Sequence, residues 1–147
     1  MRFKYAFQKI VDLKTNEKTQ AEWMLSSAIG VLQAEEKSLG ELLDNRERMA
    51  NQLQLAAEQR APVSKIREYQ MYVEHLEQCI ERKHTDVHQA NAEVELKKSQ
   101  LSHKVLDEKV WLKSRDKAKS SFQKSMLLRE QSELDEMATV RFAMKAR

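Results

Sequence analysis

The chain has 147 residues, of which 41% are hydrophobic, 33% charged and 6% aromatic, and its formal net charge is +3. It contains two glycines, one proline and one cysteine, which excludes a fold built on many turns and an intramolecular disulfide. High charge with few aromatic residues is typical of long helices or coiled coils. No apolar stretch approaches the roughly 20 residues that a membrane-spanning helix needs, and no signal peptide is recognisable. We therefore expect a cytoplasmic protein that reaches a membrane only through its partners.

The first predicted helix covers about residues 3–58. From Ala21 to Ala56 its apolar positions alternate in steps of four and three, which predicts one half of a coiled-coil seam. The positions before Ala21 follow the same steps in a shifted phase, and this predicts a stutter in the supercoil there. Gly30 and Gly40 lie inside the helix and mark soft spots, places of close approach, or tolerated surface glycines.

A turn is predicted at about residues 59–63, because Pro62 breaks a helix and biases the residue before it away from helical geometry. The second predicted helix follows, over about residues 64–145. From Ile66 to Leu101 its apolar residues recur every seven positions, which predicts the other half of the seam.

The short connection predicts an all-α fold, a long antiparallel two-helix coiled-coil hairpin without a globular core and forming a single domain over residues 1–147. Residues whose numbers sum to about 122 then face each other. Phe122 would lie beyond the start of the first helix, and the last turns of the second helix would overhang. Polar seam residues are expected to fix the register or to pair across the seam; they are Lys14, Glu17, Glu35, Arg46, Lys83 and Lys97.

Charge is unevenly distributed along the chain. Residues 1–20 carry a net charge of +3, residues 21–96 carry −6, and residues 97–147 carry +6. An antiparallel hairpin brings both basic segments to one end, so we expect a rod with a basic base and an acidic tip.

Motifs for catalysis are absent from the sequence: no glycine-rich phosphate loop and no nucleophile elbow can be built with two glycines. His84 and His88, and likewise His75 and Cys79, lie one helical turn apart, but two ligands do not close a metal site. We predict no enzymatic activity, no catalytic residues, no cofactor and no metal. The mixed charges at the basic end argue against a nucleic-acid partner, and packing on the second helix is favoured over membrane contact for the amphipathic N-terminus.

Two apolar surfaces suggest partner binding. Tyr72, Leu76 and Cys79 form a line that we interpret as lying beside the seam, although Tyr72 could instead lie flat over it. On that interpretation, alanine at positions 72 and 76 should weaken partner binding with little loss of helicity. The C-terminal overhang carries a second set of apolar residues, which a partner or the N-terminal helix would have to cover.

Three segments resemble the flagellar export protein FliJ family. Residues 3–11 (FKYAFQKIV) are similar to its F-x-F-Q-K start, and residues 69–80 (YQMYVEHLEQCI) are similar to its stretch after the hairpin turn. Residues 129–141 are similar to its C-terminal E-x-x-x-[LM]-D-E-x-A-x-x-R segment. The order and distances of the three segments around one turn make the resemblance fairly specific.

The resemblance implies a non-enzymatic central stalk and adaptor of the bacterial flagellar type III export apparatus, similar to the γ stalk of rotary ATPases. Its base would enter the export ATPase hexamer and promote ring assembly, and its hairpin end would bind the cytoplasmic domain of the export gate. Export chaperones would be further partners, and the location would be the cytoplasmic face of the inner membrane, without insertion.

The residues expected at the export gate are Leu42, Tyr69, Tyr72, Leu76 and Cys79, and those expected at the ATPase ring are Phe3, Phe7, Lys9, Arg129, Leu134, Asp135 and Arg141. Alternative readings are a general coiled-coil scaffold or chaperone, and the equivalent stalk of a virulence type III secretion system. The Phe-x-x-x-Phe-Gln-Lys start favours the flagellar branch.

Overall fold

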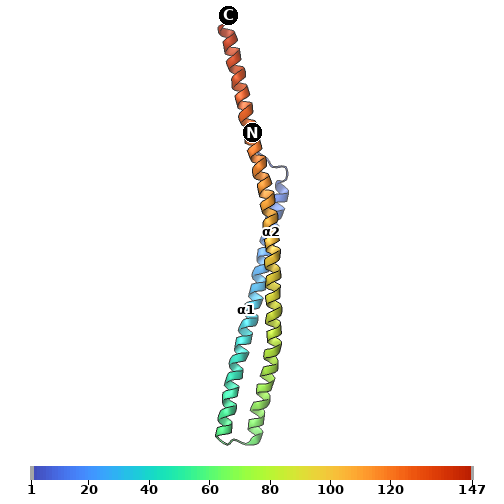
Figure 1. Cartoon of the computed structure of the whole chain (residues 1–147), viewed down its shortest axis with the longest axis vertical. Helices are drawn as coiled ribbons and strands as arrows, with labels where there is room; N and C mark the ends of the chain where they lie inside the picture. Colours follow the sequence, from blue (N-terminus) through green and yellow to red (C-terminus); the bar gives the residue numbers. More distant parts are fainter. Residues whose placement is uncertain (1, 147) are drawn as a thin grey trace. The chain divides into compact units, whose positions relative to one another are not determined.

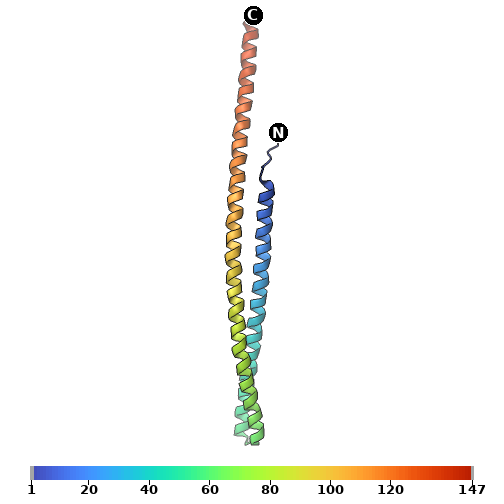
Figure 2. The same ribbon diagram turned by 90° about the vertical axis from the view of Figure 1, so that its right-hand side faces the viewer.

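The computed structural model describes residues 2–146 and contains two helices, α1 (Gln8–Glu58) and α2 (Val63–Lys145) (Figures 1 and 2). Residues 2–146 include no strand. The predicted all-α, antiparallel two-helix coiled-coil hairpin is confirmed. The predicted start of the first helix near residue 3 is wrong, because α1 begins at Gln8.

The turn between the helices closes α1 with hydrogen bonds that satisfy its last carbonyl groups. Arg60 adopts a left-handed conformation with φ of 56°, and its amide donates to the carbonyl of Ala57 at 3.3 Å. The amide of Ala61 donates to the carbonyl of Ala56 at 2.9 Å. These two bonds form a Schellman motif. After it, the carbonyl of Pro62 accepts hydrogen bonds from the amides of Lys65 and Ile66 in the first turn of α2. The helix is therefore interrupted where the proline predicted it.

Contacts between Cα atoms divide the chain into two compact units. Unit 1 comprises Met1–Thr19 and His103–Arg147, and unit 2 comprises Gln20–Ser102. Each unit contains a stretch of α1 antiparallel to a stretch of α2. The prediction of a single domain stays a prediction.

Unit 2 is held together by a narrow apolar seam. Its most buried side chains occupy the predicted heptad positions of both helices, and they are Ala28, Ala56, Leu76, Ile80, Ala90 and Val94. One polar pair interrupts the seam where Lys83 donates a 3.0 Å hydrogen bond to Glu35. This pair confirms the expected cross-seam pairing for Lys83 and Glu35. Lys97 instead pairs with Glu93 of its own helix, and Arg46 is exposed.

Unit 1 continues the heptad without the predicted stutter. Val11 is 2% exposed, and Lys18 pairs across the seam with Glu108. With these two residues on the seam, the steps of three and four run unbroken from Val11 through Ala21 into unit 2. The stutter prediction is wrong because it followed Ile10 and missed Val11 and Lys18.

Both glycines of α1 face open space, because a Cβ atom built on Gly30 or Gly40 would have no neighbour within 4 Å. They are therefore tolerated surface glycines and not points of close helix approach. We expect Gly30→Ala and Gly40→Ala each to raise the free energy of unfolding by about 1 kcal/mol, since alanine loses less conformational entropy in a helix. Urea unfolding followed by circular dichroism measures this, and a destabilised variant would contradict the assignment.

Candidate functional surfaces

The N-terminal arm, residues 2–7, packs against α2 through aromatic rings within unit 1. The rings of Phe3 and Phe122 contact each other in a tilted arrangement, with centroids 5.5 Å apart. Phe7 meets Trp111 edge-on at 5.9 Å. The hydroxyls of Tyr5 and Ser114 share a hydrogen bond of 2.8 Å. The extended arm therefore reaches residues of α2 nearer to its C-terminal end than a helix of the same residues was expected to reach. Phe122 does lie beyond the start of α1 at Gln8, but the arm lies opposite it through Phe3.

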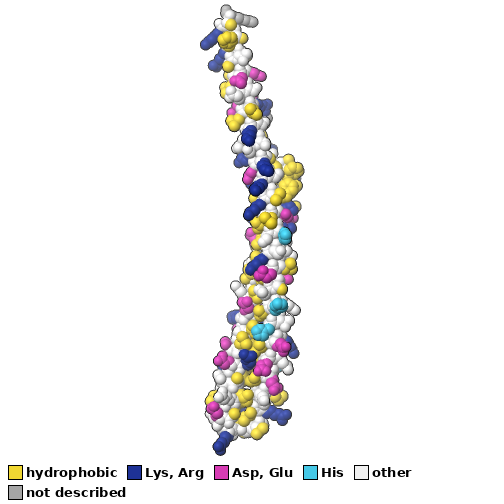
Figure 3. Space-filling view, in the orientation of Figure 1, with side chains coloured by type: hydrophobic (Ala, Val, Ile, Leu, Met, Phe, Trp, Pro, Cys, Tyr) yellow, Lys and Arg dark blue, Asp and Glu magenta, His cyan; other side chains and the backbone are white. Residues whose placement is uncertain are grey.

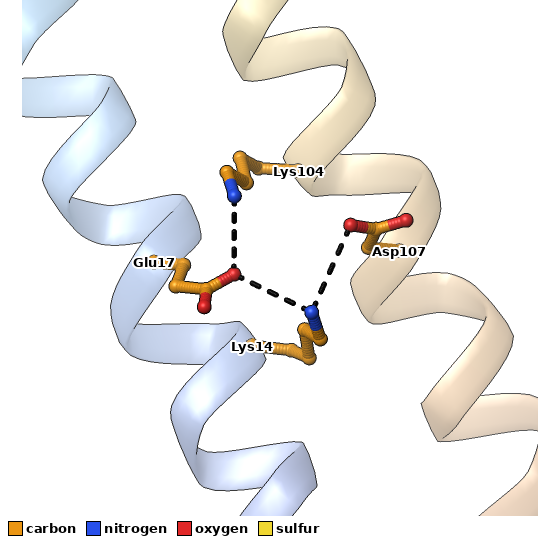
Figure 4. A network of polar contacts seen from close by, with 4 residues as sticks. All are labelled: Lys14, Glu17, Lys104 and Asp107. Carbon is orange, nitrogen blue, oxygen red and sulfur yellow. Dashed lines mark hydrogen bonds and ion pairs between the residues drawn. The ribbon is translucent and has the colours of Figure 1, made fainter.

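Behind the aromatic contacts, a network of charges links α1 to α2 in unit 1 (Figure 4). The carboxylate of Glu17 accepts a hydrogen bond from Lys104 at 3.2 Å and lies 3.6 Å from the amine of Lys14. Lys14 also reaches Asp107, at 3.9 Å. Because Glu17 and Lys104 lie on opposite helices, the network fits one register of the hairpin only, which is the specifying role that polar seam residues can have.

A second charged pair lies one turn away, where Lys18 donates to Glu108 at 3.0 Å. Glu108 is 8% exposed and is the buried charged residue of the described chain. The hydrogen bond from Lys18 lowers the pKa of Glu108, and the hydrogen bond from Lys104 lowers the pKa of Glu17. In unit 2 the hydrogen bond to Glu35 raises the pKa of Lys83.

These shifts set the direction of the pH dependence. A carboxylate whose pKa is lowered by folding stabilises the folded state above its unfolded pKa of about 4.3, and this contribution is lost as the pH falls through the folded pKa. Lys83 acts in the opposite sense, so its contribution is present below its unfolded pKa and is lost at more alkaline pH.

We therefore expect the melting temperature to fall on acidification below the ordinary glutamate range. The Glu17→Gln/Glu108→Gln variant should show a smaller fall over the same interval. Glu22→Gln/Glu36→Gln, which changes two exposed carboxylates of α1, is the matched control. Thermal melts at a series of pH values measure this. The argument would be contradicted if the melting temperatures of both variants fell equally on acidification.

The C-terminal part of α2 is uncovered. Every residue from Leu127 to Ala146 is exposed, and the apolar side chains among them include Leu128, Phe142 and Met144, at 72%, 77% and 73% exposure. A shallow hollow lies along this segment, lined by Leu134, Met137, Ala138, Arg141, Phe142, Met144 and Lys145. The predicted overhang of the second helix agrees with this exposure, and several large apolar side chains are exposed on it.

The residues predicted for the ATPase ring fall into two groups within unit 1. Phe3 and Phe7 take part in the aromatic contacts with α2, although Phe7 remains 51% exposed. The others are exposed. Lys9 lies in the first turn of α1, and Arg129, Leu134, Asp135 and Arg141 lie on the uncovered part of α2.

The residues predicted for the export gate do not form one exposed line. Leu76 is 4% exposed and belongs to the seam of unit 2, and Leu42, Tyr69 and Cys79 are half-buried. Tyr72 is 45% exposed, so it stands beside the seam and not flat over it. The interpretation of an exposed apolar stripe is wrong for Leu76. The expectation that alanine at positions 72 and 76 has little effect on helicity stays a prediction.

Several contributing residues were not singled out from the sequence. Ser114, Lys18 and Asp107 make contacts across the hairpin, between α2 and either α1 or the N-terminal arm, but all three are polar, so the pattern of apolar residues does not mark them. The partners of Lys18 and Ser114 lie 90 and 109 residues away along the chain, so only the register of the hairpin could have identified them. Cys79 lies 3.7 Å from His75, and residues 2–146 contain no cluster of three metal-binding side chains.

No helix among the described residues is long and apolar enough to cross a membrane. In the space-filling view, apolar side chains are scattered over the exposed surface of both units among charged ones (Figure 3). The geometry is therefore that of an antiparallel coiled-coil hairpin with an uncovered helix end. Coiled coils of this class can bind amphipathic helices of partner proteins through exposed apolar surface.

The chain belongs to the flagellar FliJ protein family, because the model of that family matches residues 3–147. The predicted resemblance is confirmed. The structure is also similar to that of a Chlamydia trachomatis protein described as a YscO homologue, with a TM-score of 0.74 and 16% sequence identity over 97% of each chain. At that identity the likeness concerns the fold alone. No curated protein matches the sequence. Family membership supports a role in type III protein export.

Proposed function

We propose that the protein is a non-enzymatic central stalk and adaptor of the bacterial flagellar type III export apparatus, at the cytoplasmic face of the inner membrane. The observation that carries this proposal is the uncovered end of α2, residues 127–146, in a chain of the FliJ family. Apolar side chains in water are stabilised when a partner covers them. A hexameric export ATPase with a central pore would enclose such a helix on all sides.

Unit 1 supplies the base of this stalk. It carries sixteen Lys and Arg residues against nine Asp and Glu residues, so an acidic pore lining would attract it. The aromatic contacts and the charge network hold the N-terminal arm on α2, which keeps both chain ends in the same unit. We propose that this base promotes assembly of the ATPase ring.

Unit 2 supplies the opposite binding function, toward the cytoplasmic domain of the export gate and toward export chaperones. Ten Lys and Arg residues against fourteen Asp and Glu residues give it the opposite net charge. Within it Tyr72 and Cys79 occupy equivalent heptad positions on the flank of α2, and Tyr72 offers the larger exposed surface. We propose that this flank makes the gate contact and that Leu76 supports it from the seam.

The test is binding of each partner by matched single variants of the full chain. We expect Leu134→Ser to weaken binding of the cognate flagellar ATPase, while Trp23→Ser, which removes a side chain of similar exposure in unit 2, leaves it unchanged. Truncation of a side chain at the centre of an interface costs more than about 1 kcal/mol, or about fivefold in affinity. Equal binding by both variants would contradict the assignment of the base.

For the gate domain, Tyr72→Ala should weaken binding and Met71→Ala should not. These residues are neighbours in the sequence, and both are exposed, at 45% and 62%, but they point to different faces of α2. If Met71→Ala had the larger effect, the flank assignment would be wrong.

A further inference from the structure

A second heptad runs along α2 in unit 1, on the side away from the seam. Its positions follow the 4-3 spacing of one helical face and correspond to the solvent side of a coiled coil. We call it the α2 outer face, and it consists of Leu106, Val110, Lys113, Lys117, Ser120, Lys124, Leu127, Gln131, Leu134, Ala138, Arg141 and Lys145. All twelve residues are exposed.

The α2 outer face contains no acidic residue, although residues 106–145 include seven Asp and Glu residues at other positions. Among the described residues, its lysines and its arginine form no ion pair, whereas Lys14, Lys18 and Lys104 of the same unit all do. Lys113 and Lys117 stand four residues apart, a spacing at which like charges destabilise a helix. The hairpin therefore gains no stability from this arrangement, and the charges are available to an anionic partner.

Aliphatic side chains share the face with these cations. Leu106, Val110 and Leu127 are 59%, 65% and 65% exposed, and a shallow apolar hollow is lined by Leu106, Lys109, Val110, Leu112, Lys113 and Asp116. In the space-filling view, Lys and Arg side chains gather along this part of α2 (Figure 3). The face combines positive charge with apolar surface along one straight helix.

We propose that the α2 outer face binds the surface of an anionic lipid bilayer. Such a surface meets both features at once, since phosphate headgroups attract the lysines and the acyl boundary accepts the leucines and valine. An acidic protein would need carboxylates and apolar residues at matching positions along this face, whereas an anionic bilayer presents both over its whole surface. A nucleic acid fits less well, because none of the twelve residues is aromatic and could stack on a base.

Binding through this face leaves the hairpin closed. The seam residues of the same stretch, among them Glu108 and Trp111, point to the opposite side of α2 and contact α1 or the N-terminal arm. The protein would lie on the headgroups without inserting a helix across the bilayer. Leu134 and Arg141 of this face are also proposed for the ATPase ring, so the test changes Lys113, Lys117 and Lys124 instead. The vesicle experiment contains no ATPase, so its outcome is independent of the stalk function.

The experiment is co-sedimentation of the full chain with vesicles of equal parts phosphatidylglycerol and phosphatidylcholine. We expect binding that weakens with added salt and is absent with pure phosphatidylcholine. The Lys113→Gln/Lys117→Gln/Lys124→Gln variant should bind about 100-fold more weakly, since each lysine near an anionic surface contributes about fivefold. Circular dichroism should show unchanged helicity, because all three side chains are exposed.

A matched control, Lys37→Gln/Lys65→Gln/Arg67→Gln, removes the same charge from exposed positions of unit 2 and should bind like the unchanged protein. Leu106→Gln/Val110→Gln should weaken binding at high salt as well as at low salt. No binding to anionic vesicles would overturn the proposal, and so would an equal loss in the unit 2 control. Binding of polyglutamate but not of vesicles would instead indicate an acidic protein partner.

Discussion

Leu76→Ala is expected to lower the free energy of unfolding by about 3 kcal/mol, because it removes one of the few large buried side chains of the seam. Leu76 is 4% exposed, and the seam of unit 2 offers little material that could close the resulting cavity, since several of its buried positions are alanines. Chemical denaturation followed by circular dichroism measures the change. We expect the midpoint to fall while the initial helicity under native conditions decreases only if the hairpin is already marginal.

Tyr72→Ala is the matched control for this prediction. Tyr72 lies one turn before Leu76 but is 45% exposed, so its removal should cost less than about 1 kcal/mol. Equal destabilisation by the two variants would show that Tyr72 is as much a core residue as Leu76. The comparison also decides how a gate-binding defect is interpreted. If Leu76→Ala destabilises unit 2, its loss of gate binding follows from unfolding and does not identify a contact residue.

Removing residues 128–147 is expected to abolish stimulation of the cognate flagellar ATPase while leaving the hairpin folded. The described residues of this segment are all exposed, and the contacts of Phe122 with the N-terminal arm are retained. The melting temperature of the remaining chain should therefore change little, because no seam contact is lost. ATPase turnover with the shortened chain should fall to that of the ATPase alone.

Two outcomes would count against this prediction. Full stimulation by the shortened chain would mean that the base of the stalk lies elsewhere in unit 1, for example on the N-terminal arm. A large drop in melting temperature would mean that residues 128–147 stabilise the hairpin in solution, and the loss of stimulation could then follow from unfolding alone.

Much of the fold could be predicted because a coiled coil is specified by local periodicity. Every apolar seam position that recurs by seven from Ile66 to Leu101 is buried or half-buried in the structure. The single proline and the absence of other breaks fixed the turn. The pairing of Glu35 with Lys83 also followed from periodicity, since charged residues on a seam need partners across it.

The N-terminus could not be predicted from periodicity. Phe3, Tyr5 and Phe7 are compatible with a helix, but their rings find better contacts on α2 when the chain leaves the helix before Gln8. Tertiary packing of aromatic side chains overrides a weak helix preference at a chain end, where few backbone hydrogen bonds are lost. The misassigned stutter has the same origin, since it was extrapolated from those residues.

The binding surfaces were only partly predictable. The apolar character of the C-terminal end was visible in the sequence, and its exposure is confirmed. For the gate surface, Leu76 satisfied both a heptad position and an apolar line with Tyr72, and only the structure decides between a seam residue and an exposed one. Apolar residues beside a seam are ambiguous because positions four residues apart differ by only about 40° around the helix axis.

The central claim is that this chain is the stalk of an export ATPase, and the most direct test is ATP hydrolysis by the cognate flagellar ATPase with and without the full chain, with closed rings counted by negative-stain microscopy. The account predicts faster turnover together with more closed rings, and no effect from an unrelated coiled coil of similar length. Unchanged turnover and unchanged ring numbers at saturating concentrations of the chain would contradict the stalk function.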